Sequence, residues 1–170
     1  MDTTDLLLEA FGRIAPIATS AVEGLDADAL NARPDAEANP IAWLVWHLAR
    51  VQDDHVAEVA GREQVWTAGG WSERFALPLD DADIGYGHSR EQVAAVRVES
   101  SDLLSGYVQA VCDATTTYLR SLAAEDLDRV VDEQWDPPVT LGVRLVSVLG
   151  DDLQHAGQAS YVRGLVTRTR

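Results

Sequence analysis

The chain has 170 residues, of which 46% are hydrophobic and 24% charged, a balance typical of a folded globular domain and not of a disordered segment. Its 28 acidic residues outnumber 13 basic ones, and the formal net charge of −15 argues against nucleic acid and anionic membranes as partners. Every basic residue is Arg and Cys112 is the only cysteine, so lysine chemistry, an intramolecular disulfide and a thiolate metal cluster are excluded.

The amino terminus carries no sign of a targeting segment. Residues 1–5 lack a basic start followed by an apolar run, and no stretch approaches the roughly 18 apolar residues that a membrane span requires. The length fits one hydrophobic core. We therefore expect a soluble, cytoplasmic protein with a single domain over residues 1–170.

Two amphipathic helices are predicted in the first 60 residues. Apolar residues recur at three- and four-residue spacing from an Asp/Thr-rich start to Gly24, and Pro16 inside this pattern predicts either a bend or a helix in two pieces. After a polar stretch over residues 25–37, Asn39 as N-cap and Pro40 at the first helical position predict a second helix that runs to Ala60 and stops at Gly61.

The second half of the chain predicts two more long helices. Residues 62–88 show no sustained period and indicate a long structured loop, followed by a short helix capped by Ser89 with Gln92. A third main helix is expected over residues 102–122, a brief strand at 130–131, and a break at 136–138. Thr140 then caps a fourth helix that continues to Gly164. Four long helices with unequal connections predict an all-α four-helix bundle with a long crossover connection.

Three side chains have a spacing that suits a metal site. His47 lies in the middle of the second helix, and Asp151 and His155 lie four residues apart on the fourth, so both project from one helix face. Bundles build metal sites from such a pair and one residue of a facing helix. The spacing alone also fits a core histidine and a surface Asp–His hydrogen bond, and Gly150 beside the pair suggests a close backbone approach.

Two segments resemble a known family. Residues 39–50, with Trp43, Trp46 and His47, and residues 151–158, with the Asp-x3-His pair, resemble the DinB/YfiT-like superfamily of four-helix metalloproteins. The resemblance covers essentially the whole chain and implies His47, Asp151 and His155 as metal ligands, with Asp152 as the competitor of Asp151. With an acid at position 151, the chain resembles the mycothiol-dependent branch of the family, whose members tend to carry an acid at this position. This branch includes mycothiol S-transferases and the metal-binding domain of mycothiol-dependent maleylpyruvate isomerase.

The resemblance implies a divalent-metal-dependent S-transferase that detoxifies electrophiles. Three N/O ligands leave a tetrahedral ion one open position, and a thiol in that position becomes a nucleophile at neutral pH. The expected metal is Zn²⁺, with Ni²⁺, Mn²⁺ and Fe²⁺ compatible with the same ligands. The expected partners are mycothiol as co-substrate, a small electrophile and, from the habit of the family, a second copy in a homodimer. A non-catalytic metal-binding stress protein and a metal-dependent hydrolase using water are the alternatives.

Other side chains are candidates around the site. Asp54 and His88 are the candidate catalytic residues: Asp54 to orient a ligand or water, and His88 at the pocket mouth as proton donor or substrate contact. An exposed helix residue and an ordinary loop residue are their alternatives. Gln158 and Trp43 are expected beside the bound cofactor, and His55 exposed or behind the ligands. Three aromatic residues of the long loop are expected to form an apolar pocket wall: Trp66, Trp71 and Phe75.

Overall fold

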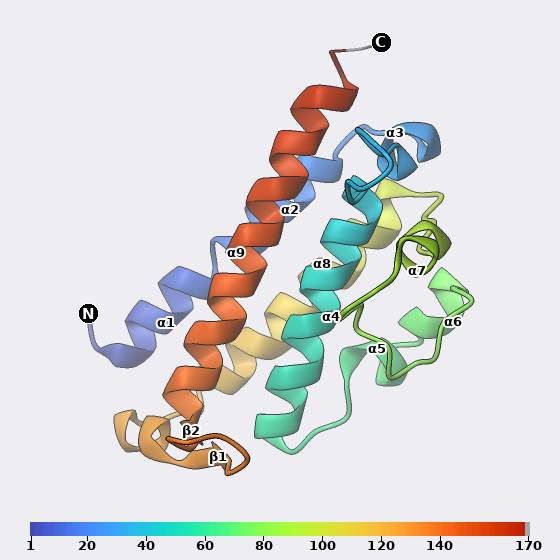
Figure 1. Ribbon diagram of the computed structural model, residues 1–170. Helices are drawn as coiled ribbons and strands as arrows, with labels where there is room; N and C mark the ends of the chain where they lie inside the picture. Colours follow the sequence, from blue (N-terminus) through green and yellow to red (C-terminus); the bar gives the residue numbers. More distant parts are fainter. Residues whose placement is uncertain (169–170) are drawn as a thin grey trace.

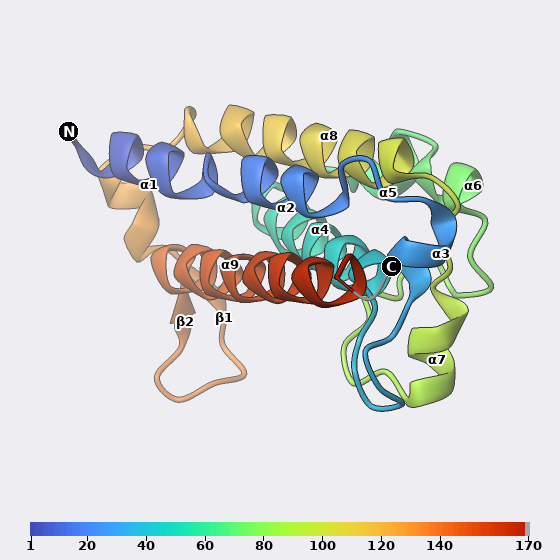
Figure 2. The same ribbon diagram turned by 90° about the horizontal axis from the view of Figure 1, so that it is seen from above.

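The computed structural model describes residues 1–168 and forms a four-helix bundle (Figure 1). The first bundle helix is divided into α1 (Thr3–Phe11) and α2 (Ile14–Val22). The other three bundle helices are α4 (Ile41–Ala60), α8 (Ser101–Leu119) and α9 (Leu141–Val166). Seen from above, α1, α2 and α8 form one layer and α4 and α9 the other (Figure 2). The buried apolar core lies between the layers. The predicted all-α bundle is confirmed.

The first helix is in two pieces, as Pro16 predicts, but the break precedes the proline. Helix α1 ends at Phe11 and α2 begins at Ile14, so Pro16 is the third residue of α2. A proline in the first turn lacks only an N–H that would have no partner there, whereas its ring clashes with the carbonyl four residues earlier, which belongs to Gly12. The break at residues 12–13 removes that clash.

The boundaries of the other long helices agree with the sequence to within a few residues. Pro40 is the N-cap of α4, one residue later than predicted, and Gly61 ends the helix in the left-handed conformation at φ 62°. Ser100 caps α8, which ends at Leu119. Thr140 caps α9 as predicted, and the helix runs two residues beyond Gly164.

Within residues 1–168, the connections contain four short α-helices, of which the sequence predicted only the one after Ser89. Residues 25–37 include α3 (Ala27–Asn31), and the long loop contains α5 (Val65–Ala68) and α6 (Trp71–Phe75). The capped helix after Ser89 is α7 (Arg90–Ala95). Helices of four to six residues span less than two turns, too few for a hydrophobic period to be recognised. The crossover that joins α4 to α8, residues 61–100, contains the loop predicted at residues 62–88 and covers one side of α4 as an ordered structure.

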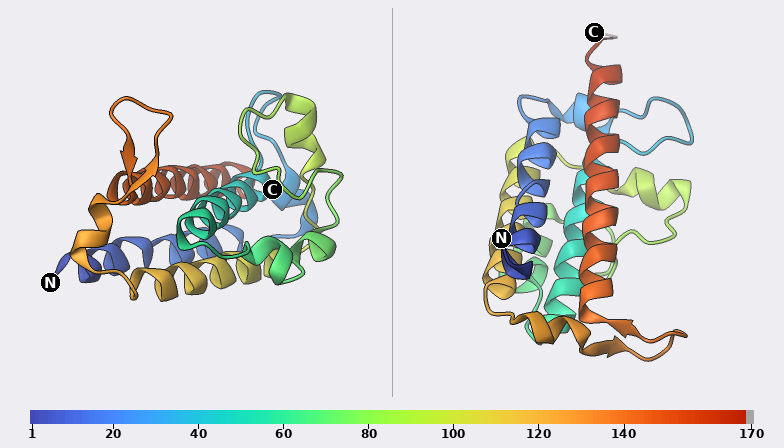
Figure 3. Two further views of the ribbon diagram at one scale, coloured as in Figure 1. Left: turned by 90° about the horizontal axis from the view of Figure 1, so that it is seen from below. Right: turned by 90° about the vertical axis from the view of Figure 1, so that its left-hand side faces the viewer.

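A β-hairpin projects from the end of the bundle where α9 begins (Figure 3). It follows the short helix η1 (Ala124–Asp128) and pairs β1 (Val130–Asp132) with β2 (Val139–Thr140), antiparallel, with Val130 opposite Thr140. The brief strand predicted at residues 130–131 is confirmed. Among residues 1–168, none of the helices combines the length and apolar character needed to cross a bilayer.

Candidate metal centre

The structure brings His47, Asp151 and His155 together. One ligand atom from each of the three side chains lies within 4.8 Å of the other two. His47 comes from α4 and the other two from α9, and these helices lie side by side along one face of the bundle (Figure 1). Because positions 151 and 155 are one turn apart, both side chains face α4 at the level of His47.

Hydrogen bonds at the outer ring nitrogens orient both imidazoles. His47 Nδ1 lies 2.5 Å from the carbonyl oxygen of Ile84, and His155 Nδ1 lies 3.0 Å from Oε1 of Gln158. Both oxygens can only accept, so each Nδ1 carries the proton and each Nε2 is the atom that offers a lone pair. Gln158 thus lies beside the site, as expected from the sequence, and it orients the imidazole of His155 by accepting a hydrogen bond from Nδ1.

The carboxylate of Asp151 completes the donor set. Its Oδ1 lies 3.5 Å from Nε2 of His155, and its buried Oδ2 has no hydrogen-bond partner within residues 1–168. Burial alone raises the pKa of Asp151, but the hydrogen bond and charge of His155 outweigh it and the net pKa is lowered. Burial lowers the pKa of His47. The hydrogen bond to Asp151 raises the pKa of His155, so a cation must displace that proton.

Asp152 points elsewhere. It is fully buried in the core, where burial raises the pKa of its carboxyl well above the ordinary value. Neighbouring residues on a helix differ by about 100° around the axis. The face of α9 that presents Asp151 to His47 therefore turns Asp152 away, and of the two acids only Asp151 joins the histidines.

Trp43 and His88 support His47 from behind. The Trp43 indole stacks on the His47 imidazole with ring centroids 4.5 Å apart, and its Nε1 donates to Nδ1 of His88 at 3.1 Å. Nε2 of His88 is held by Asp83 at 2.8 Å, and the His88 side chain is only 2% exposed. His88 is thus not at the pocket mouth, because both ring nitrogens are engaged and the ring lies against Trp46.

Asp54 lies apart from the three ligands. It accepts a hydrogen bond from Nε2 of Gln64 at 2.7 Å and lies 3.7 Å from His55 Nδ1. His55 is half-buried and accepts a hydrogen bond from Nη1 of Arg144 at 2.9 Å. The structure therefore directs Asp54 toward the crossover, and His55 toward the start of α9.

A glycine does approach the site, but it is not Gly150. A Cβ atom on Gly150 would meet nothing within 4 Å. Gly85, at φ +89°, lies directly on the ligand ring: a Cβ there would be 2.7 Å from Nδ1 of His47 and 3.0 Å from the Trp46 ring. The predicted close backbone approach thus comes from the crossover and not from α9.

A cavity of about 660 Å³ is lined by two of the three candidate ligands, His47 and Asp151, and by the polar side chains of His55, Asp132 and Arg144. Its rim carries two exposed aromatic side chains, Tyr86 (91% exposed) from the crossover and Trp135 (68%) from the hairpin. Aliphatic side chains line its walls: Val51, Ile84, Val139, Val143 and Val148. The predicted wall of Trp66, Trp71 and Phe75 is wrong, because these rings pack around buried Tyr107 instead.

The DinB superfamily model matches residues 13–159, a span that includes all three candidate ligands. The chain belongs to the DinB superfamily. Proteins of this superfamily often bind metal, and some are metal-dependent enzymes. The crystal structure of a conserved protein from Enterococcus faecalis is similar to this DinB chain, with a TM-score of 0.92 and 35% identity over 98% of each chain. A search of curated proteins finds no significant match.

The residues of this DinB domain fit a divalent cation. Two imidazole nitrogens and one carboxylate are a donor set typical of catalytic zinc sites with one open position. The unpartnered Oδ2 of Asp151 is a buried charge-bearing atom that a cation would satisfy. Gln158 and the Ile84 carbonyl supply the outer hydrogen bonds that fix metal-ligating histidines.

Proposed function

We propose that this DinB protein is a divalent-metal-dependent S-transferase that joins a small thiol, mycothiol, to an apolar electrophile. The observation that carries the proposal is the position of the donor set: His47 and Asp151 line a cavity whose surface is mostly apolar. A purely structural metal site is closed by four protein ligands, whereas three ligands beside a cavity leave room for a substrate.

The chain divides the work of the reaction among its residues. His47 and His155 would hold Zn²⁺ through Nε2, and Asp151 would balance part of its charge. When bound, the cation supplies a positive charge that lowers the pKa of a thiol beside it. The thiol proton leaves to solvent, the sulfur lone pair forms the new C–S bond, and the leaving group departs with the electron pair of its broken bond to carbon. The aliphatic side chains of the cavity wall would pack against the electrophile.

Two cavities support a reaction between two substrates. A second cavity of about 600 Å³ lies on the opposite side of the three ligands along the same pair of helices, one turn before His47 on α4 and one turn beyond His155 on α9. Asn39, Gln158 and Tyr161 line it with amide, hydroxyl and aromatic groups. Leu44, Val162 and Leu165 also line this cavity, so the hydroxyl-rich head of mycothiol would bind through the few polar groups there, and the electrophile would occupy the first cavity.

The chain itself offers no competing thiol nucleophile. Burial raises the pKa of Cys112 to about 12, and its Sγ contacts Gln52 inside the bundle. A thiol with this pKa is almost entirely protonated at neutral pH and unreactive. The nucleophile must therefore come from a bound substrate. The hydrolase alternative lacks support, because Asp54 and His88, its candidate bases, are held by Gln64 and Asp83.

The test measures metal content and turnover together. Zn²⁺-loaded protein is mixed with mycothiol and a halogenated bimane, and we expect mycothiol to be consumed as the fluorescent conjugate forms. His47→Ala and His155→Ala should weaken Zn²⁺ binding by more than the roughly 10–100-fold typical of outer hydrogen-bond partners, and abolish turnover. Cys112→Ala is the control and should keep both.

Cobalt substitution separates the proposal from its alternatives. Mycothiol added to the Co²⁺-loaded protein should produce a sulfur-to-metal charge-transfer band. Metal binding without this band and without conjugate formation with any electrophile of a panel would leave a metal-binding protein and refute the transferase. Full metal occupancy in both histidine variants would refute the site itself.

A further inference from the structure

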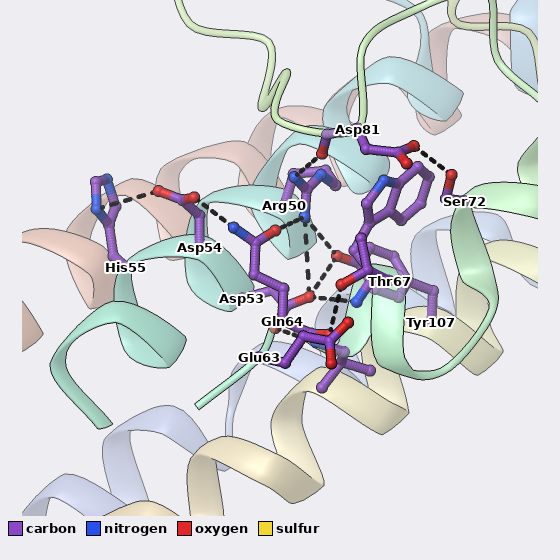
Figure 4. A network of polar contacts seen from close by, with 12 residues as sticks. Arg50, Asp53, Asp54, His55, Glu63, Gln64, Thr67, Ser72, Asp81 and Tyr107 are labelled. Atoms are coloured by element: carbon purple, nitrogen blue, oxygen red, sulfur yellow. Dashed lines mark hydrogen bonds and ion pairs between the residues drawn. The ribbon is translucent and has the colours of Figure 1, made fainter. Parts of the chain in front are cut away.

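A buried arginine lies one turn from His47 on the same helix. The side chains of Arg50 and its counter-ion Asp53 are both 0% exposed, with Nη1 and Oδ2 3.8 Å apart. The guanidinium donates to the carbonyl oxygens of two crossover residues, from Nη2 to Asp81 at 2.9 Å and from Nε to Asp83 at 3.3 Å. Figure 4 shows Arg50 between α4 and the loop segment of the crossover that carries Asp81.

The residues that Arg50 holds lead directly to the metal ligand. Asp83, whose carbonyl oxygen binds Arg50, precedes Ile84, whose carbonyl oxygen accepts from Nδ1 of His47. The Asp83 carboxylate accepts from the Gly85 N–H and contacts Nε2 of His88, both at 2.8 Å. The segment 81–85 is therefore fixed by Arg50 on one side and by the turn around Asp83 on the other.

We propose that Arg50 is a positioning residue of the metal centre. By holding segment 81–85, it places the Ile84 carbonyl so that the His47 proton stays on Nδ1 and the lone pair of Nε2 stays available to the cation. This inference rests on the metal site of the proposed function and not on its thiol chemistry. It gives a buried ion pair outside the cavity a role in metal affinity.

The chemistry of the guanidinium explains why arginine occupies this position. Its planar fork serves two carbonyl oxygens, while Nη1 donates to Oε1 of Gln64 at 2.8 Å and to the Tyr107 hydroxyl at 3.3 Å. Asp53 in turn accepts from the Val65 and Trp66 N–H groups and from Tyr107. A lysine keeps the charge opposite Asp53 but, as a compact ammonium, cannot serve both carbonyls and the Gln64 amide in this geometry.

The first test follows the proton on His47 in the metal-free protein. With ¹⁵N-labelled histidine at pH 8, NMR of the wild type should show His47 as the Nδ1–H tautomer, assigned with His47→Gln. Arg50→Lys should release segment 81–85 and produce a mixture with the Nε2–H tautomer. Tyr107→Phe is the matched control, because it removes one hydroxyl from the same buried network and leaves both carbonyl contacts of Arg50 in place.

The second test measures Zn²⁺ affinity by competition with a chelator. Arg50→Lys should weaken it about 10–100-fold, the range typical of a partner behind a metal-ligating histidine, and Tyr107→Phe by less than about twofold. Asp83→Ala, which releases the other side of the segment, should weaken it similarly. The double variant Arg50→Lys/Asp83→Ala should bind Zn²⁺ with the same affinity as whichever single variant binds it less tightly. The two losses should not add, because both substitutions act through one segment.

The outcomes decide the proposal. The proposed role of Arg50 is overturned if Arg50→Lys folds, keeps the His47 tautomer of the wild type and binds Zn²⁺ within about twofold of the wild-type affinity. Equal losses in Arg50→Lys and Tyr107→Phe also overturn it, since they would show a general effect of core stability. If Arg50→Lys does not fold, Arg50→Gln/Asp53→Asn removes both charges together and leaves no uncompensated buried charge, so the same two measurements apply to it.

Discussion

At His47, a single hydrogen bond determines which ring nitrogen is free to bind a cation. The acceptor is a backbone carbonyl, that of Ile84, and the next residue is Gly85 at φ +89°. Only a residue without a side chain can place backbone this close to the ring, since a Cβ would lie 2.7 Å from Nδ1. The geometry of the candidate metal centre thus depends on a glycine outside the donor set.

We predict that Gly85→Ala weakens Zn²⁺ binding at least tenfold, because the added methyl group displaces His47 or the Ile84 carbonyl. Gly87→Ala is the matched control: Gly87 also has a positive φ, of +69°, but a Cβ there meets nothing within 4 Å. Both variants should lose about 1–2 kcal/mol of stability from the left-handed backbone. Equal Zn²⁺ affinities in chelator competition would contradict the prediction.

At the scale of elements, Arg144 connects three parts of the molecule. From the first turn of α9 it donates to Asp132 on β1 at 3.1 Å, and to His55 and Glu58 on α4 at 2.9 and 3.3 Å. These contacts hold the hairpin, and with it Trp135, over the apolar cavity. Arginine only donates, so His55 Nδ1 must accept and the imidazole must be neutral.

This contact predicts a pH-dependent stability. Burial and the charge of Arg144 lower the pKa of His55 from 6.5 in the folded protein. Below pH 6.5 the unfolded chain therefore binds the proton more readily, so the free energy of unfolding falls as the pH drops from 6.5 through the lowered folded pKa. His55→Gln keeps an acceptor but cannot titrate. Urea unfolding at pH 8 and pH 5 should show a larger loss for wild type than for His55→Gln, and equal losses would refute the assignment.

At the scale of the whole molecule, the three ligands connect two helices that are far apart in the sequence. His47 lies on α4, and Asp151 and His155 on α9 about a hundred residues later. A cation bound by all three stabilises the folded bundle, because the unfolded chain does not present the ligands together. Binding of a cation at this site would therefore be coupled to folding.

We predict that Zn²⁺ at a free concentration 100 times its dissociation constant stabilises the wild type by about 2.7 kcal/mol. For a chain of this size, this corresponds to a rise in Tm of about 5–10 °C. Differential scanning calorimetry with and without EDTA measures the rise, and Mg²⁺ should not reproduce it. An equal rise in His155→Ala would show that the metal binds elsewhere.

The sequence predicted the features that depend on residues close together along the chain. The four long helices follow from hydrophobic periodicity, and the capping box at Ser89 and the stop at Gly61 follow from local hydrogen bonding and glycine conformation. The Asp-x3-His pair follows from the helical repeat. Each of these patterns operates within a few residues and can be read without the fold.

Only the tertiary structure decided which side chains meet. Asp151 and Asp152 are the same residue type at neighbouring positions, so the sequence does not distinguish them. The packing of α9 against α4 determines which of them faces His47. Trp66 and Trp71 are aromatic residues of the kind that line pockets, yet they pack in the hydrophobic core. Tyr86 and Trp135 form the rim of the cavity instead. The Ile84 carbonyl carries no side-chain signal at all. Such contacts join segments distant in sequence, and their geometry is fixed by packing in three dimensions, which no local pattern encodes.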